Sequence, residues 1–263
     1  MKLHPIIEYW PYVMLAARYQ YDLDTTNDKP NDYIETVLRR WHPDMIQYRP
    51  YFIGDAFSYV LELPDKVLLV HLGTRNNKEM RGNFTGAIGG FFANVLPFRE
   101  KSECNSSFWK AGCETFDILK RFWLTKKPII NIGHSRGCAR AVVFAIRSFQ
   151  SIGQKPLTVQ YEPPPPLTKK GVKNYLKSGL DECTYCVKSP NDIVVKANMF
   201  GYYHHVGIEV DLPDVPGQMA DIPFVGGHAY STVTEGLKVW AREYGRCPEG
   251  AVYLEEREFV EVC

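Results

Sequence analysis

The fold is decided by Pro128-Ile129-Ile130-Asn131-Ile132-Gly133-His134-Ser135-Arg136-Gly137-Cys138-Ala139. Four of its first five residues are apolar and three of these are isoleucine, which is typical of a short buried strand, and a helical run begins at Arg136. The pattern G-x-S-x-G lies between them. In that context the serine occupies a strained strand-to-helix turn, and the two glycines remove side chains that would clash with it. The segment therefore predicts a nucleophilic serine, although the same pattern also occurs by chance in ordinary turns.

Strands and helices alternate on both sides of this segment. A hairpin that begins near Phe57 leads into an apolar strand at 67–72, and a helix over about 105–123 precedes the serine. After the helix at 136–149, short strands are expected at 157–161, 184–188 and 206–210. This order predicts an α/β fold with a mostly parallel central sheet flanked by helices. Ligands bind such sheets at the carboxyl ends of the strands.

Length and composition favour one domain. The 263 residues are 45% hydrophobic and 23% charged, which argues against disorder and repetitive folds, so we expect a single domain over 1–263. Within it, 1–50 is a helical part that packs behind the sheet or shapes the substrate pocket, 57–240 is the core, and 241–263 is a tail. A net charge of +1 gives no reason to expect nucleic acid as a partner.

Nothing in the sequence predicts a membrane span or a convincing signal peptide, because no stretch approaches 18 uninterrupted apolar residues and Glu8 and two prolines interrupt the opening segment. We therefore expect a soluble, cytoplasmic protein. Reduced thiols are the default for its seven cysteines. The lone C-x-x-C at Cys183 and Cys186 favours buried thiols over a zinc site.

A nucleophilic serine needs a base and an orienting acid further along the chain. Three histidines follow Ser135, namely His204, His205 and His228. His228 lies in a glycine loop before a helical run, which makes it the better base. Asp192 lies in a turn directly after the strand at 184–188 and is the preferred acid. Its competitors are expected to be solvated loop carboxylates or caps: Asp181, Asp211, Asp214 and Asp221.

Taken together, five segments resemble the successive motifs of the class 3 (fungal lipase-like) branch of the α/β hydrolases. In chain order they are 67–74 (VLLVHLGT), 133–137 (GHSRG), 191–194 (NDIV), 205–210 (HVGIEV) and 228–230 (HAY). The resemblance runs from about Phe57 to about Trp240. The separations agree with it, at 57 residues from Ser135 to Asp192 and 36 from there to His228.

The resemblance implies roles for these residues. Ser135 is the nucleophile, Asp192 the acid and His228 the base, while Thr74 and the amide of Arg136 form the oxyanion hole. His205 matches a strand position of the family and is interpreted as structural. No metal or organic cofactor is implied.

A lid-like segment is expected after the oxyanion strand, at 87–98. Its glycines and apolar residues suit a mobile cover or an acyl-binding wall, and they equally suit a fixed part of the core. Four residues are expected to bind substrate: His134, Phe91, Phe92 and Leu96. The prolines at 163–166 predict a rigid wall beside the site.

Three positions depart from the family pattern. Leu72 replaces an arginine, Lys110-Ala111-Gly112-Cys113 replaces His-x-Gly-Phe, and Arg136 replaces a small or apolar residue. The Arg136 side chain either points away from the site or favours an anionic substrate.

The sequence therefore predicts a carboxylic ester hydrolase of the lipase or esterase kind, which acts through an acyl-enzyme. Its partner is a small-molecule or lipid ester, and a lipid substrate would bring transient contact with a membrane surface or micelle. The alternatives are a thioesterase, amidase or phospholipase on the same triad, because a triad fixes acyl chemistry and not the leaving group. A binding protein that keeps the hydrolase fold without turnover also remains open.

Overall fold

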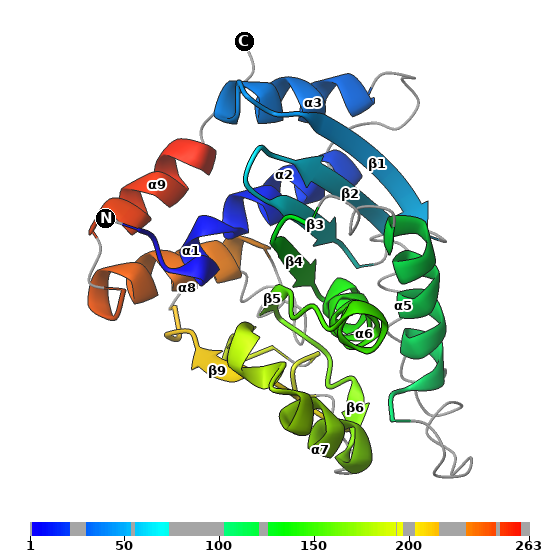
Figure 1. Ribbon diagram of the computed structural model, residues 1–263. Coiled ribbons are helices and arrows are strands. Elements are labelled where there is room, and N and C mark those ends of the chain that lie inside the picture. Colours follow the sequence, from blue (N-terminus) through cyan, green and yellow to red (C-terminus); the bar gives the residue numbers. More distant parts are fainter. Residues whose placement is uncertain are drawn as a thin grey trace.

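The computed structural model describes residues 2–21, 30–53, 56–73, 103–120, 126–192, 194–196, 203–215, 230–245 and 248–258. A seven-stranded sheet in the order β1-β2-β3-β4-β5-β7-β9 forms its centre (Figure 1). The strands are β1 (Gln47–Ile53), β2 (Ala56–Glu62), β3 (Val67–His71), β4 (Ile129–His134), β5 (Leu157–Tyr161), β7 (Thr184–Lys188) and β9 (Ile208–Asp211).

The first three strands pair antiparallel, and every pairing from β3 across to β9 is parallel. The predicted mostly parallel sheet flanked by helices is thus confirmed. β5 and β7 have the predicted bounds, whereas β9 begins two residues later than expected, after Gly207, whose φ of 99° turns the chain into the strand.

Helices cover both faces of the sheet (Figure 1). One face carries α1 (Pro5–Glu8), α2 (Trp10–Tyr21), α8 (Tyr230–Glu243) and α9 (Pro248–Glu258), and the other carries α5 (Ser106–Leu119) and α6 (Arg136–Ile152). α3 (Pro30–Trp41) precedes β1 along the chain. α7 (Lys169–Ser178) lies beside a small ribbon formed by β6 (Leu167–Thr168) and β8 (Tyr203–His204), and a short 3-10 helix, η2 (Asp181–Cys183), leads into β7.

The core divides on the two faces of the strands. In β3, Leu68 and Val70 face the cluster that α1 and α2 complete, whereas Val67 and Leu69 face Phe116 of α5 on the opposite side. Successive side chains of a strand point to opposite faces, so a strand covered on both faces reads as an unbroken apolar run. This explains why all five residues of β3 are buried.

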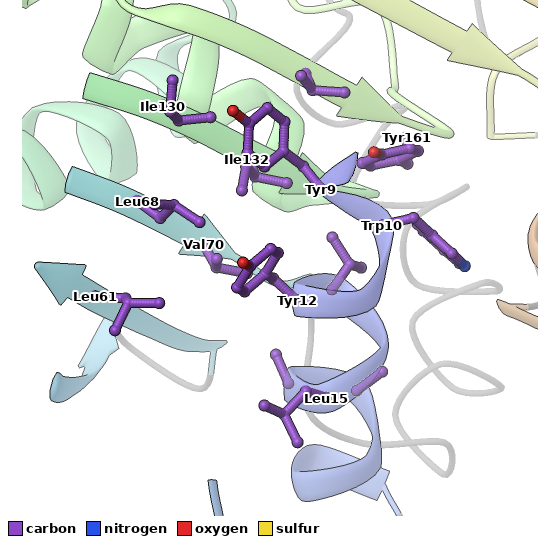
Figure 2. Packing of buried hydrophobic residues seen from close by; sticks show 14 of the residues in the cluster. Tyr9, Trp10, Tyr12, Leu15, Leu61, Leu68, Val70, Ile130, Ile132 and Tyr161 are labelled. Atoms are coloured by element: carbon purple, nitrogen blue, oxygen red, sulfur yellow. The ribbon is translucent and has the colours of Figure 1, made fainter. Parts of the chain in front are cut away.

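The N-terminal helices pack directly on the sheet. Figure 2 shows Tyr9, Trp10, Tyr12 and Leu15 facing side chains of β2 to β5. Trp10 is completely buried, and the Tyr161 hydroxyl of β5 donates to the carbonyl of Ile6 at 2.8 Å. This contact joins the start of the chain to the carboxyl end of a central strand.

Two elements differ from the expected division of the chain. β1 begins at Gln47, inside the part expected to be helical, and α9 lies in the acidic tail. β1 gives no alternating apolar signal and contains Pro50, which an edge strand tolerates because one side of it needs no ladder hydrogen bonds. Across the described helices, none is long and apolar enough to cross a membrane.

Candidate active site

Ser135 occupies the turn between β4 and α6. Its backbone has φ 55° and ψ −131°, a conformation that costs a non-glycine residue roughly 1–3 kcal/mol. Two hydrogen bonds hold it there: the Ser135 N–H donates to the carbonyl of Tyr161 at 3.0 Å, and the Cys138 N–H donates to the carbonyl of Ser135 at 2.9 Å. Strain of this kind is typical of residues with a function, because the surrounding structure must maintain it.

The two glycines of the motif allow close backbone contact. A Cβ on Gly133 would lie 2.6 Å from the backbone nitrogen of Cys138, and a Cβ on Gly137 would lie 2.1 Å from the carbonyl oxygen of His71. The sequence interpretation held that these side chains would clash with the serine. The structure corrects this point, because the clashes are with α6 and with the end of β3.

The chain after β3 lies against the serine. A Cβ on Gly73 would lie 3.3 Å from the Ser135 Oγ and 3.6 Å from the Arg136 nitrogen. The guanidinium of the buried Arg140 donates to the carbonyl of Leu72 at 3.4 Å, which fixes this end of the strand. The Arg136 amide belongs to the first turn of α6, where the helix dipole favours negative charge, and the Arg136 side chain is exposed.

Asp192 lies at the carboxyl end of β7 and is completely buried. It caps a turn, since the Val194 N–H donates to its Oδ1 at 2.7 Å and the Lys196 N–H donates to its carbonyl at 3.2 Å. Among the competing aspartates that the structure describes, Asp211 and Asp214 are exposed and Asp181 is half-buried. The buried carboxylate is the one that the sequence favoured.

Sequence reasoning missed Glu162, which directly follows β5. The residue is completely buried and has φ 54°. Its Oε1 accepts a hydrogen bond from the Ser189 hydroxyl at 2.5 Å. Burial raises the pKa of Glu162 well above its usual value, and the Asp192 carboxyl raises it further. The available signal was a carboxylate at the end of a central strand, where this fold places its ligands.

An aromatic cluster joins the serine turn to α8. The His134 ring stacks on Tyr230 with centroids 4.2 Å apart, and both rings lie near Trp10. His134, which was expected to bind substrate, is 3% exposed. Tyr230 begins α8, two residues after His228.

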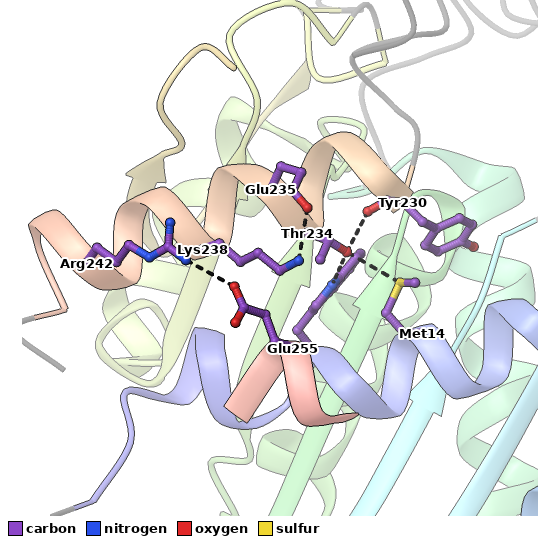
Figure 3. A network of polar contacts seen from close by, with 8 residues as sticks. Met14, Tyr230, Thr234, Glu235, Lys238, Arg242 and Glu255 are labelled. Carbon is purple, nitrogen blue, oxygen red and sulfur yellow. Dashed lines mark hydrogen bonds and ion pairs between the residues drawn. The ribbon is translucent and has the colours of Figure 1, made fainter. Parts of the chain in front are cut away.

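Polar contacts anchor the first turn of α8. The Trp10 indole N–H donates to the Thr234 hydroxyl at 2.8 Å, and that hydroxyl donates to the carbonyl of Tyr230 at 2.8 Å (Figure 3). Further along the same helix, ion pairs join Lys238 to Glu235 and Arg242 to Glu255 of α9. The start of α8 is thereby held against α2.

Several predicted site residues lie outside the described residues: Thr74, Phe91, Phe92, Leu96 and His228. His205 is described, and its Nε2 hydrogen-bonds with the carbonyl of Val195 at 2.9 Å, while burial lowers the pKa of its ring. The prolines at 163–166 are buried directly after Glu162.

The C-x-x-C motif divides between two elements. Cys186 is buried on β7, and Cys183 lies in η2. Within the described ranges, no group of three or more histidine, cysteine or acidic side chains forms a cluster that would hold a metal ion.

The chain was compared with family models, curated proteins and solved structures. Neither a family model nor a curated protein matches the sequence. Among solved structures, lipase II from Rhizopus niveus is 18% identical over 78% of this chain and 80% of its own, with a TM-score of 0.55. Lip2 lipase from Yarrowia lipolytica is 15% identical over 86% of both chains, with a TM-score of 0.54.

A third similar structure is a triacylglycerol lipase described as having a serine protease triad at its catalytic centre. It is 16% identical over 80% of each chain, with a TM-score of 0.53. At these identities the likeness establishes the fold. The resemblance seen in the five motifs is thus confirmed at that level: the chain has the α/β-hydrolase fold of the fungal class 3 lipases.

Proposed function

We propose that this protein is a serine hydrolase that cleaves carboxylic esters, including lipid esters, through an acyl-enzyme. The observation that carries the proposal is the strained Ser135 turn at the start of α6, with the backbone of Gly73 against its hydroxyl. A hydroxyl in such a turn can attack a carbonyl carbon, and the amide that follows it at the start of α6 is the proposed donor to the carbonyl oxygen. The lipases that share the fold support an ester as the substrate.

The proposed mechanism assigns one role to each residue. The Ser135 Oγ attacks the ester carbonyl while His228 takes its proton, and Asp192 orients and stabilises the resulting imidazolium. The amides of Thr74 and Arg136 donate to the oxyanion, each contributing about 3 kcal/mol of transition-state stabilisation. His228 returns the proton to the leaving alcohol, and a water activated by the same ring then releases the acid.

The α8 contacts support His228 as the base. In the sequence the histidine lies two residues before the helix turn that Trp10 and His134 hold beside the strand leading to Ser135. A base must lie within hydrogen-bond reach of the hydroxyl that it deprotonates, so a fixed helix start restricts where the base can lie.

The test is hydrolysis of p-nitrophenyl esters from acetyl to palmitoyl, with and without detergent. Ser135→Ala should lower the rate at least about a thousandfold, because the serine and histidine act as a unit. Ser148→Ala is the matched control, since Ser148 is a completely buried serine on the same helix. A fluorophosphonate probe tests the nucleophile independently of ester turnover, because it should label the wild type and not Ser135→Ala. Turnover that survives Ser135→Ala contradicts the proposal.

The same assay defines the substrate. Esters, thioesters and amides of one acyl length separate the leaving-group classes, and the preferred chain length measures the acyl site. A folded protein that neither turns over any of these substrates nor reacts with the fluorophosphonate would instead be a binding protein.

A further inference from the structure

Two carboxyl groups share one buried site at the carboxyl edge of the sheet. Glu162 follows β5 and Asp192 follows β7, which is the neighbouring strand, and both side chains are completely buried. Ser189 links the two residues, because its hydroxyl donates to Glu162 Oε1 at 2.5 Å and its carbonyl accepts from the Asp192 N–H at 3.3 Å. Since burial penalises each negative charge and each carboxylate repels the other, one of the two residues must carry a proton.

The surroundings of the pair favour a single negative charge. The groups that face Glu162 from the elements around it are the thiols of Cys186 on β7 and Cys138 on α6, and burial raises the pKa of both thiols, so both are neutral. No ion pair joins Glu162 to a cation among the residues that the structure describes. Two adjacent carboxylates in such a place cannot both ionise.

The next titratable groups are His205 and Lys188. His205 faces Asp192, and burial lowers the pKa of its ring, so it is neutral near pH 7. Lys188 points to the acidic side chains of β9, with its Nζ 2.6 Å from Glu209 and 3.5 Å from Asp211. The lysine therefore offers its charge to the edge strand and not to the Glu162 carboxyl.

The hydrogen bonds assign the proton. Asp192 Oδ1 accepts from the Val194 backbone, a contact that favours the charged form of Asp192. Glu162 Oε1 accepts from the Ser189 hydroxyl, but Glu162 Oε2 receives no hydrogen bond from any described donor and is completely enclosed. A buried oxygen without a donor is satisfied when it carries a proton and donates it itself.

We propose that Glu162 is a positioning residue that stays protonated and donates a hydrogen bond from Oε2 to the Asp192 carboxylate. The inference rests on the proposed function, in which Asp192 orients His228. A donor on Asp192 restrains the direction of its carboxylate and reduces its affinity for the histidine proton. Glu162 thereby sets the pH at which His228 becomes a competent base. Glu162 has a left-handed backbone, which is strained for a non-glycine residue, and such strain is expected where the surrounding structure fixes the position of a side chain.

The test is the acidic limb of the kcat/KM profile, which reports the proton on the base. Glu162→Gln keeps a neutral donor to Asp192 and an acceptor for Ser189, so the limb should stay within about 0.3 pH units of wild type. Glu162→Gly removes the carboxyl and suits the positive φ, so the fold is not strained. In this variant the limb should rise by about 0.5–1 unit, and kcat should fall about tenfold.

Two outcomes overturn the inference. If Glu162 is ionised in the wild type, both substitutions remove a negative charge, and the limb falls by about one unit in both variants. If the limb does not move in Glu162→Gly, the residue has only a structural role. Fluorophosphonate labelling of each variant shows that Ser135 is intact in the protein compared.

An infrared measurement separates this inference from the proposed function. A protonated carboxylic acid has a carbonyl stretch apart from those of carboxylates, and near pH 7 that band should appear in the wild type and vanish in Glu162→Gln. If the band behaves so while the protein hydrolyses no ester, the carboxyl pair stands and the proposed function fails. If the wild type lacks the band, the proposed protonation is wrong whatever the activity.

Discussion

The contact between α6 and β3 gives the sharpest stability prediction. Gly137 lies on the first turn of α6, and a Cβ there would lie 2.1 Å from the carbonyl oxygen of His71 and 2.6 Å from its carbon. Both partners are backbone atoms in a completely buried strand, so no side chain can turn away. Cβ atoms essentially never lie closer than 3.0 Å to another heavy atom, so Gly137→Ala must move the first turn of α6 away from the sheet by about 1 Å.

The expected cost is about 3 kcal/mol of unfolding free energy, the upper end for overpacking a rigid core. Gly153→Ala is the matched control at the other end of the same helix. Gly153 has φ 69° and nothing within 4 Å of its added Cβ, so only the left-handed backbone is penalised, by about 1 kcal/mol. Urea unfolding of the two variants should thus differ by about 2 kcal/mol.

The same displacement should reach the active site. Moving the start of α6 shifts Ser135 and the Arg136 amide relative to Gly73. Fluorophosphonate labelling of folded Gly137→Ala should therefore slow about a hundredfold, while Gly153→Ala labels as wild type. If both variants lose the same unfolding free energy, or if Gly137→Ala labels normally, then α6 does not rest on β3 as described.

Two further substitutions test the buried polar contacts. Thr234→Val leaves the Trp10 indole N–H without its acceptor and should cost about 1–3 kcal/mol in urea, more than Thr115→Val, which loses only a bond to the Ala111 carbonyl within α5. His71 is neutral in the fold because burial and then the charge of Arg140 lower its pKa to about 3, whereas the unfolded chain takes up a proton near pH 6.5. The free energy of unfolding therefore falls as pH is lowered from about 6.5 towards 3, by up to about 1.4 kcal/mol per pH unit. In His71→Gln the urea midpoint should depend less steeply on pH over this range. The same steepness in wild type and variant would refute the burial of a neutral ring.

The serine turn was predictable because backbone geometry leaves few alternatives there. The two glycines are needed where backbones approach closely, and the isoleucines fill the two covered faces of β4. β5 and β7 were predictable for a related reason: short apolar runs between turn residues are covered on both faces.

Other parts of the site were not predictable, because burial depends on neighbours distant in the sequence. Glu162 looks like a solvated loop carboxylate, and only the packing of the prolines, Ser189 and Asp192 around it makes it a buried acid. His134 adjoins the nucleophile in sequence, but alternation along β4 turns its ring into the core, against Tyr230. β1 lacked an apolar signal because an edge strand buries fewer of its side chains.

The bond between Trp10 and Thr234 spans 224 residues of sequence and joins α2 to α8. During synthesis at about 5–20 residues per second, the tryptophan is added to the chain roughly 10–45 s before its acceptor. During that interval α2 can pack against strands β2 to β4, which are made earlier. The part of its apolar face that α8 covers stays without its partner. A nascent chain stalled before residue 234 should therefore expose an aromatic helix to which chaperones bind. The chaperones should dissociate once α8 has been made and packs against α2.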